Sequence, residues 1–174
     1  MIYIVGLQHA LQIGAYDGSA PGHSDLVDAA VMDRVKAGLA HWVDTLEINV
    51  IAEEMTRQAI ERRGMDPDET PAVAVCRCKG IPHEFVDVDS QERFEIAAQL
   101  SDRVSIAAIR EAIWSDRLAR YYGHNVLMLC GAVHVATFAL TLLNYNDVDQ
   151  LGVTILHREW VPIGCKQRFV ASGP

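Results

Sequence analysis

Short apolar runs alternate along the chain with stretches of helical periodicity. Four runs have the length of buried strands, and they cover residues 1–6, 48–52, 84–88 and 126–130. Apolar residues recur at helical spacing from Val27 to Leu46. Further helical patterns cover residues 55–63, 91–103, 105–122 and 135–143. Strands that alternate with helices predict an α/β fold, in which a mainly parallel sheet is flanked by helices.

The length and the C-terminal region complete the predicted architecture. A chain of 174 residues is typical of one domain, so we predict a single compact domain over residues 1–174. Residues 153–156 and 169–171 are candidate late strands, for which an antiparallel C-terminal edge is one arrangement. Residues 7–24 have the composition of a loop.

Charge and composition exclude some partners. A net charge of −8 argues against nucleic acid or an anionic membrane as the main partner. No apolar run approaches the length of a membrane span, and no signal segment is visible, so we predict no membrane partner. The four cysteines do not form a disulfide scaffold, and their use fits a cytoplasmic protein.

Two Gly-x-x-His motifs follow predicted strands. Gly6 to His9 follows the first strand, and Gly131 to His134 follows the fourth. Open α/β sheets place their chemistry at the carboxyl ends of parallel strands, so these two imidazoles could share one metal ion. The spacing also occurs at 38–41 and 80–83, but there it lies within a helical pattern and before a strand. A glycine lets the chain turn sharply off the strand and approach a ligand closely.

Carboxylates follow the other two predicted strands. The second strand ends at Glu53 and Glu54, and the third delivers Asp87 or Asp89. Two histidines and a carboxylate with an open position suit a hydrolytic metal centre containing Zn, Mn, Fe or Co. Since neighbouring strand residues point to opposite faces, we expect one of the two glutamates to be solvated, and both remain candidates. Asp89 is equally a candidate N-cap for the following helix.

Four segments together resemble the Tiki/TraB superfamily, which also includes relatives of erythromycin esterase and the ChaN haem-binding lipoproteins. These segments are IVGLQH (4–9), VIAEEM (50–55), FVDVDSQER (85–93) and VLMLCGAVHV (126–135). The resemblance implies an α/β core with a metal-dependent hydrolase centre. In Tiki proteins the activity is proteolytic, with manganese or cobalt as the cofactor.

The resemblance also implies roles for individual residues. His9 and His134 would be metal ligands or their immediate neighbours. Glu53 or Glu54 would bind metal or act as the general base. Asp89 and Arg93 would match the acidic and basic positions after the third strand. The arginine expected on the helix before the last motif is Arg110 or Arg117.

These observations predict a metal-dependent hydrolase, a peptidase or an esterase, that acts on a small molecule or a peptide. A metal-held water would attack the carbonyl, a glutamate would take its proton, and an arginine or the metal would stabilise the oxyanion. One alternative is a non-catalytic protein that binds haem or another small ligand. Another is a homo-oligomeric interaction protein anchored by Trp42, Trp114 and Trp160. The distance between His9 and His134 separates the last alternative from the others.

Overall fold

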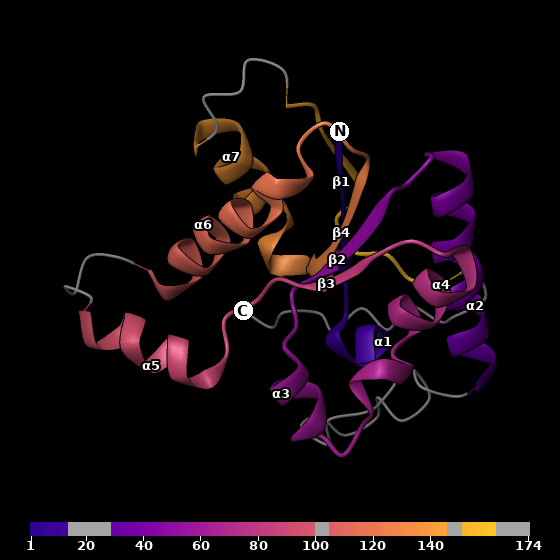
Figure 1. Cartoon of the computed structure of the whole chain (residues 1–174), viewed down its shortest axis with the longest axis horizontal. Helices are drawn as coiled ribbons and strands as arrows, with labels where there is room; N and C mark the ends of the chain where they lie inside the picture. The colour runs from indigo at the N-terminus through magenta and orange to yellow at the C-terminus, as the bar shows by residue number, and fades with distance from the viewer. Residues whose placement is uncertain (14–28, 100–104, 146–150, 163–174) are drawn as a thin grey trace, which may run out of the picture.

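A five-stranded, wholly parallel sheet forms the centre of the molecule. The computed structural model describes residues 1–13, 29–99, 105–145 and 151–162 (Figure 1). The strands are β1 (Ile2–Leu7), β2 (Val50–Glu53), β3 (His83–Phe85), β4 (Val126–Gly131) and β5 (Val153–His157). They lie in the order β3-β2-β4-β1-β5. The predicted α/β fold with a parallel sheet and flanking helices is therefore confirmed.

The edge strand corrects one detail of that prediction. β5 pairs with β1 in the parallel sense, so the antiparallel C-terminal edge is wrong. The other candidate late strand, at 169–171, lies outside the described residues. β3 is shorter than predicted, because the chain leaves the sheet after Phe85 while Val86 and Val88 remain buried.

Helices cover both faces of the sheet (Figure 1). The helices are α1 (His9–Ile13), α2 (Ala29–Thr45), α3 (Arg57–Glu61), α4 (Pro71–Lys79), α5 (Ser90–Gln99), α6 (Ile106–Leu118) and α7 (Val135–Tyr145). Short 3-10 turns are η2 (Pro67–Glu69), η3 (Ala119–Tyr121) and η4 (Ala132–His134). α6 and α7 lie on one side of the sheet, while α1, α2 and α4 lie on the other. α1 falls within the predicted loop 7–24, of which residues 14–24 lie outside the described residues.

Each face of the sheet has its own hydrophobic core. Met128 and Cys130 of β4 pack with Trp114 and Phe138 in the core beneath α6 and α7. Leu127 of β4 points the other way, into the core beneath α2 and α4. A parallel sheet buried on both faces requires nearly continuous apolar strands, which explains why the sequence shows runs rather than alternation.

The position of β4 determines which residues meet. β4 is inserted between β1 and β2, and it pairs in parallel with both of them. The segments that follow β1, β2 and β4 therefore all leave the sheet at its carboxyl end and lie next to one another, although they are far apart in the sequence. None of the described helices has the length and apolar character needed to cross a membrane.

Candidate functional site

The two Gly-x-x-His histidines meet beside Gly131. A Cβ atom placed on Gly131 would lie 3.1 Å from Nε2 of His9, 3.4 Å from Oε2 of Glu54 and 3.7 Å from Cδ2 of His134. These three side chains come directly after β1, β2 and β4, which are three neighbouring strands of the sheet. The structure therefore brings the predicted histidines and one predicted glutamate together. The alternative in which the histidines are incidental required His9 and His134 to lie far apart, and they lie side by side.

A buried carboxylate holds His134 in place. Nδ1 of His134 lies 2.7 Å from Oε1 of Glu111 on α6, whose side chain is only 3% exposed. Since an ionised carboxylate only accepts hydrogen bonds, the imidazole donates through Nδ1. In the neutral imidazole Nε2 is then the acceptor, and it lies 3.4 Å from Oε1 of Glu54. Thr137 also donates to Glu111, and the rings of Trp114 and His134 pack edge to face.

Sequence reasoning missed Glu111 because it lies inside a helical pattern. The buried residues of α6 are Glu111, Trp114, Ser115 and Leu118, which have the spacing of one helical face. A glutamate on an otherwise mostly apolar face is the signal that points to it, because a buried carboxylate needs a partner.

Glu54 is fixed by two other groups. Arg110 donates to Oε1 at 2.7 Å, and the backbone N–H of Gly131 donates to Oε2 at 2.7 Å. The expectation that one of the two glutamates is solvated is wrong, since Glu53 is 1% exposed and Glu54 is 2% exposed. Both are buried because each side of the strand end supplies polar partners.

Asp87 and Arg110 form a buried ion pair next to Glu54. Nε and one Nη of Arg110 each donate to Asp87 at 2.8 Å, and Arg93 and Trp114 also donate to this carboxylate. Burial alone would raise the pKa of Asp87, but the hydrogen bond and charge of Arg110, with the charge of Arg93, lower it below its ordinary value. Burial likewise opposes the charged form of Arg110, yet Asp87 and Glu54 raise its pKa.

These groups line a cleft of about 400 Å³. Its walls also include residues of α3 and of the segments that follow it and β3. The lining residues are His9, Glu54, Met55, Thr56, Ala59, Arg62, Arg63, Asp87, Val88, Ser90, Arg93, Arg110 and His134.

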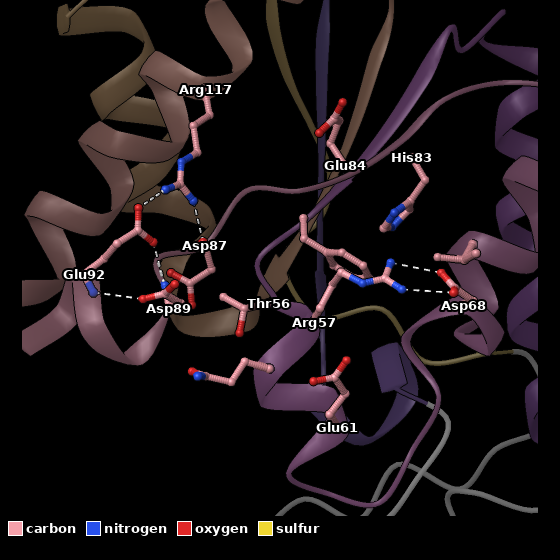
Figure 2. Close-up of a pocket in the computed structure, with 13 residues that line it drawn as sticks. Thr56, Arg57, Glu61, Asp68, His83, Glu84, Asp87, Asp89, Glu92 and Arg117 are labelled. Atoms are coloured by element: carbon pink, nitrogen blue, oxygen red, sulfur yellow. Dashed lines mark hydrogen bonds and ion pairs between the residues drawn. The ribbon is translucent and has the colours of Figure 1, made fainter.

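A second cleft, of about 730 Å³, adjoins the first along Thr56 and Asp87. Figure 2 shows it between two ion pairs, Arg57 with Asp68 on one side and Arg117 with Glu92 on the other. The charged groups of these walls are thus largely engaged with one another.

Three predicted site residues lie away from the first cleft. Glu53 accepts hydrogen bonds from His83 and Thr70 instead. Asp89 caps α5, because its carboxylate accepts from two backbone N–H groups of the first turn, while its own N–H donates to Glu92. Arg117 binds Glu92 and backbone carbonyls beside the second cleft.

The glycines allow close approach rather than sharp turns. Gly131 has an ordinary extended backbone, with φ −59° and ψ 141°, and its missing Cβ makes room for His9. Gly6 lies within β1, where a Cβ would be 1.9 Å from the carbonyl oxygen of Arg158. The chain turns into η4 directly after Gly131 without a backbone conformation that requires glycine, and close approach of this glycine to a ligand stays a prediction.

No family model, curated protein or solved structure matches this chain. Within the residues that the structure describes, no three His, Cys, Asp or Glu side chains form a ready-made metal site.

Proposed function

We propose that the cleft beside Gly131 is the active site of a hydrolase that acts on an ester or amide bond, with His134 as the general base. The observation that supports this proposal is the Glu111–His134 pair. A buried carboxylate holds Nδ1 at 2.7 Å, and Nε2 is directed to a cleft lined by charged groups. This is the arrangement by which a carboxylate orients a catalytic imidazole.

In this mechanism Nε2 of His134 takes a proton from a water molecule as the water attacks the scissile carbonyl. The resulting imidazolium lies between the carboxylates of Glu111 and Glu54, which stabilise its charge. Arg110 and Arg93 together neutralise Glu54 and Asp87, so these two buried carboxylates do not repel the developing oxyanion. The imidazolium then returns its proton to the leaving oxygen or nitrogen as the scissile C–O or C–N bond breaks, which releases a carboxylic acid and an alcohol or amine.

A metal-dependent version of the same site is the second candidate, as the family resemblance implies. Its specific support is the convergence of His9, Glu54 and His134 beside Gly131. Nε2 of His134 lies 3.4 Å from Oε1 of Glu54, so these two side chains, with His9, are the residues that would hold the ion. Imidazole and carboxylate donors are of the type that Zn, Mn, Fe or Co prefer, and binding would require the three side chains to move closer together. When bound, it would polarise the carbonyl and lower the pKa of its water.

The test is a hydrolysis screen of esters and peptides, each measured with a chelator and with added divalent metals. The proposal predicts turnover that persists in the chelator. Turnover that disappears in the chelator and returns with Mn, Co, Zn or Fe supports the metal-dependent version instead.

Metal analysis of purified protein provides the second arm. In the metal-dependent version, His9→Gln and His134→Gln each lower the bound metal, whereas His83→Gln does not. Unchanged metal content in both cleft variants contradicts that version. Absence of turnover under all conditions contradicts both.

A further inference from the structure

The cleft is locally basic on an acidic chain. Four arginines line it, against the two carboxylates of Glu54 and Asp87, while the chain carries a net charge of −8. Arg110 and Arg93 are bound to these two carboxylates. The positive charge that remains belongs to Arg62 and Arg63.

Arg62 and Arg63 have few partners of their own. Nη1 of Arg62 donates to the hydroxyl of Ser90 at 2.6 Å, and Nη1 of Arg63 donates to the carbonyl of Ala59 at 2.8 Å. Within the described parts of the chain, neither guanidinium has a carboxylate partner. Since a guanidinium has five N–H donors, most of theirs remain available to a ligand.

Arg57, at the start of α3, is a neighbouring arginine whose charge is compensated within the protein. Both of its Nη atoms donate to Asp68 at 2.9 Å, beside the second cleft. Its charge is thus neutralised within the protein, as is usual on a surface rich in acidic residues. Of Arg57, Arg62 and Arg63, the two that line the first cleft are the two without a carboxylate partner among the described residues.

Guanidinium groups recognise oxyanions through paired, charge-assisted hydrogen bonds. The hydroxyls of Thr56 and Ser90 also line this cleft, and hydroxyls can donate to the same oxygens. Both arginines are exposed, and on an acidic chain two adjacent cations without a carboxylate partner form a local positive potential that attracts anions.

We infer that the ligand of the first cleft carries an anionic oxygen group, a phosphate or a carboxylate, and that Arg62 and Arg63 bind it. This inference rests on the proposed function, since it names the substrate class of that active site. The reacting bond would lie toward His134, and the anionic group toward the segment after α3.

The test measures binding without turnover, with inorganic phosphate and acetate as probes and calorimetric titration as the readout. Wild type is expected to bind at least one probe. Arg62→Gln with Arg63→Gln is expected to weaken this binding at least tenfold, and each single variant to weaken it less. The matched control Arg57→Gln removes one charge from the same segment and is expected to change the dissociation constant less than twofold. Circular dichroism confirms that each variant is folded, and the single variants suffice if the double variant is not.

Three results would overturn the inference: no binding of either probe to wild type, unchanged binding in the cleft variants, or equal weakening in Arg57→Gln. Equal weakening in Arg57→Gln would show that the overall positive charge of residues 57–63, and not Arg62 and Arg63 in particular, attracts the anion. The proposed hydrolase fails separately, in a turnover assay with His134→Gln, because the binding assay does not require catalysis.

Discussion

Two neighbouring glutamates at the end of β2 each meet a histidine, and their surroundings differ. Glu53 binds Nε2 of His83 at 2.6 Å, with Thr70 as a further donor. Glu54 lies 3.4 Å from Nε2 of His134, whose other nitrogen is held by Glu111. In the first pair the carboxylate of Glu53 is hydrogen-bonded to Nε2 of His83, so this nitrogen is not available to a substrate. In the second a separate carboxylate orients the ring and leaves that nitrogen facing the cleft.

This difference shows that a histidine next to a glutamate does not by itself make a site. Chemistry also needs a ring nitrogen free to accept a proton and a space for substrate beside it. Both histidines line a cleft, since His83 borders the second and His134 the first. The two pairs differ in the ring nitrogen, because Nε2 of His83 is held by Glu53 at 2.6 Å, whereas Nε2 of His134 lies 3.4 Å from Glu54 and is not held at hydrogen-bond geometry. We therefore interpret the Glu53–His83 pair as structural and the Glu54–His134–Glu111 set as functional.

The largest expected effect comes from the orienting carboxylate. Glu111→Gln keeps the volume of the side chain but removes the charge that stabilises the imidazolium. We expect kcat/KM to fall on the order of 10²–10⁴-fold, as for the orienting carboxylate of a catalytic triad. The pH profile of kcat/KM should also change, since a purely structural role would leave its shape intact.

The buried ion pair should dominate the stability of the site. Asp87→Ala leaves Arg110 buried without its main partner, so we expect the free energy of unfolding to fall by about 3–5 kcal/mol. Urea denaturation measures this change. A loss no larger than that of a surface substitution would show that water or Glu54 replaces Asp87.

The comparison between the two glutamates is tested by matched amides. We expect Glu54→Gln to lower kcat/KM about 10–100-fold, because it alters the charge beside Nε2 of His134. Glu53→Gln should change kcat/KM less than about threefold while lowering thermal stability, because its pair lies outside the cleft. An equal loss of activity in both variants would remove the distinction between the two pairs.

The smallest expected effect is the acid dependence of Asp87. Its pKa is lowered in the folded state, so the unfolded chain takes up the proton first as the pH falls. The stabilisation by Asp87 is therefore complete above about pH 5, and it is lost as the pH falls below about 4. The stability difference between wild type and Asp87→Asn should shrink over this range. A difference that stays constant down to pH 2.5 contradicts the lowered pKa.

Sequence reasoning predicted the fold class because buried parallel strands produce uninterrupted apolar runs. It could not predict that β4 inserts between β1 and β2, since strand order depends on long-range packing. Placement after a strand singled out His9 and His134, which do meet. Arg110 and Arg117 could not be separated, because they lie two turns apart on one face of α6 and both contact the segment around Asp87.

The roles of the carboxylates were harder to predict from the sequence, because they too depend on long-range packing. Glu53 and Glu54 are both buried, so solvation could not distinguish them. Asp89 lies close to the site in sequence, but backbone N–H groups at the start of α5 engage its carboxylate. Glu111 comes from a helix face and not from a strand end, so a search limited to strand ends does not reach it.

The most direct test of the account is the turnover of two histidine variants on one hydrolysed substrate. His134→Gln and His83→Gln each remove an imidazole that lies within 2.7 Å of a buried glutamate. We predict that His134→Gln lowers kcat on the order of 10²–10⁴-fold and that His83→Gln keeps kcat within about threefold of wild type. Unchanged turnover in His134→Gln, or an equal loss in both variants, would contradict the assignment of the active site to the cleft beside Gly131.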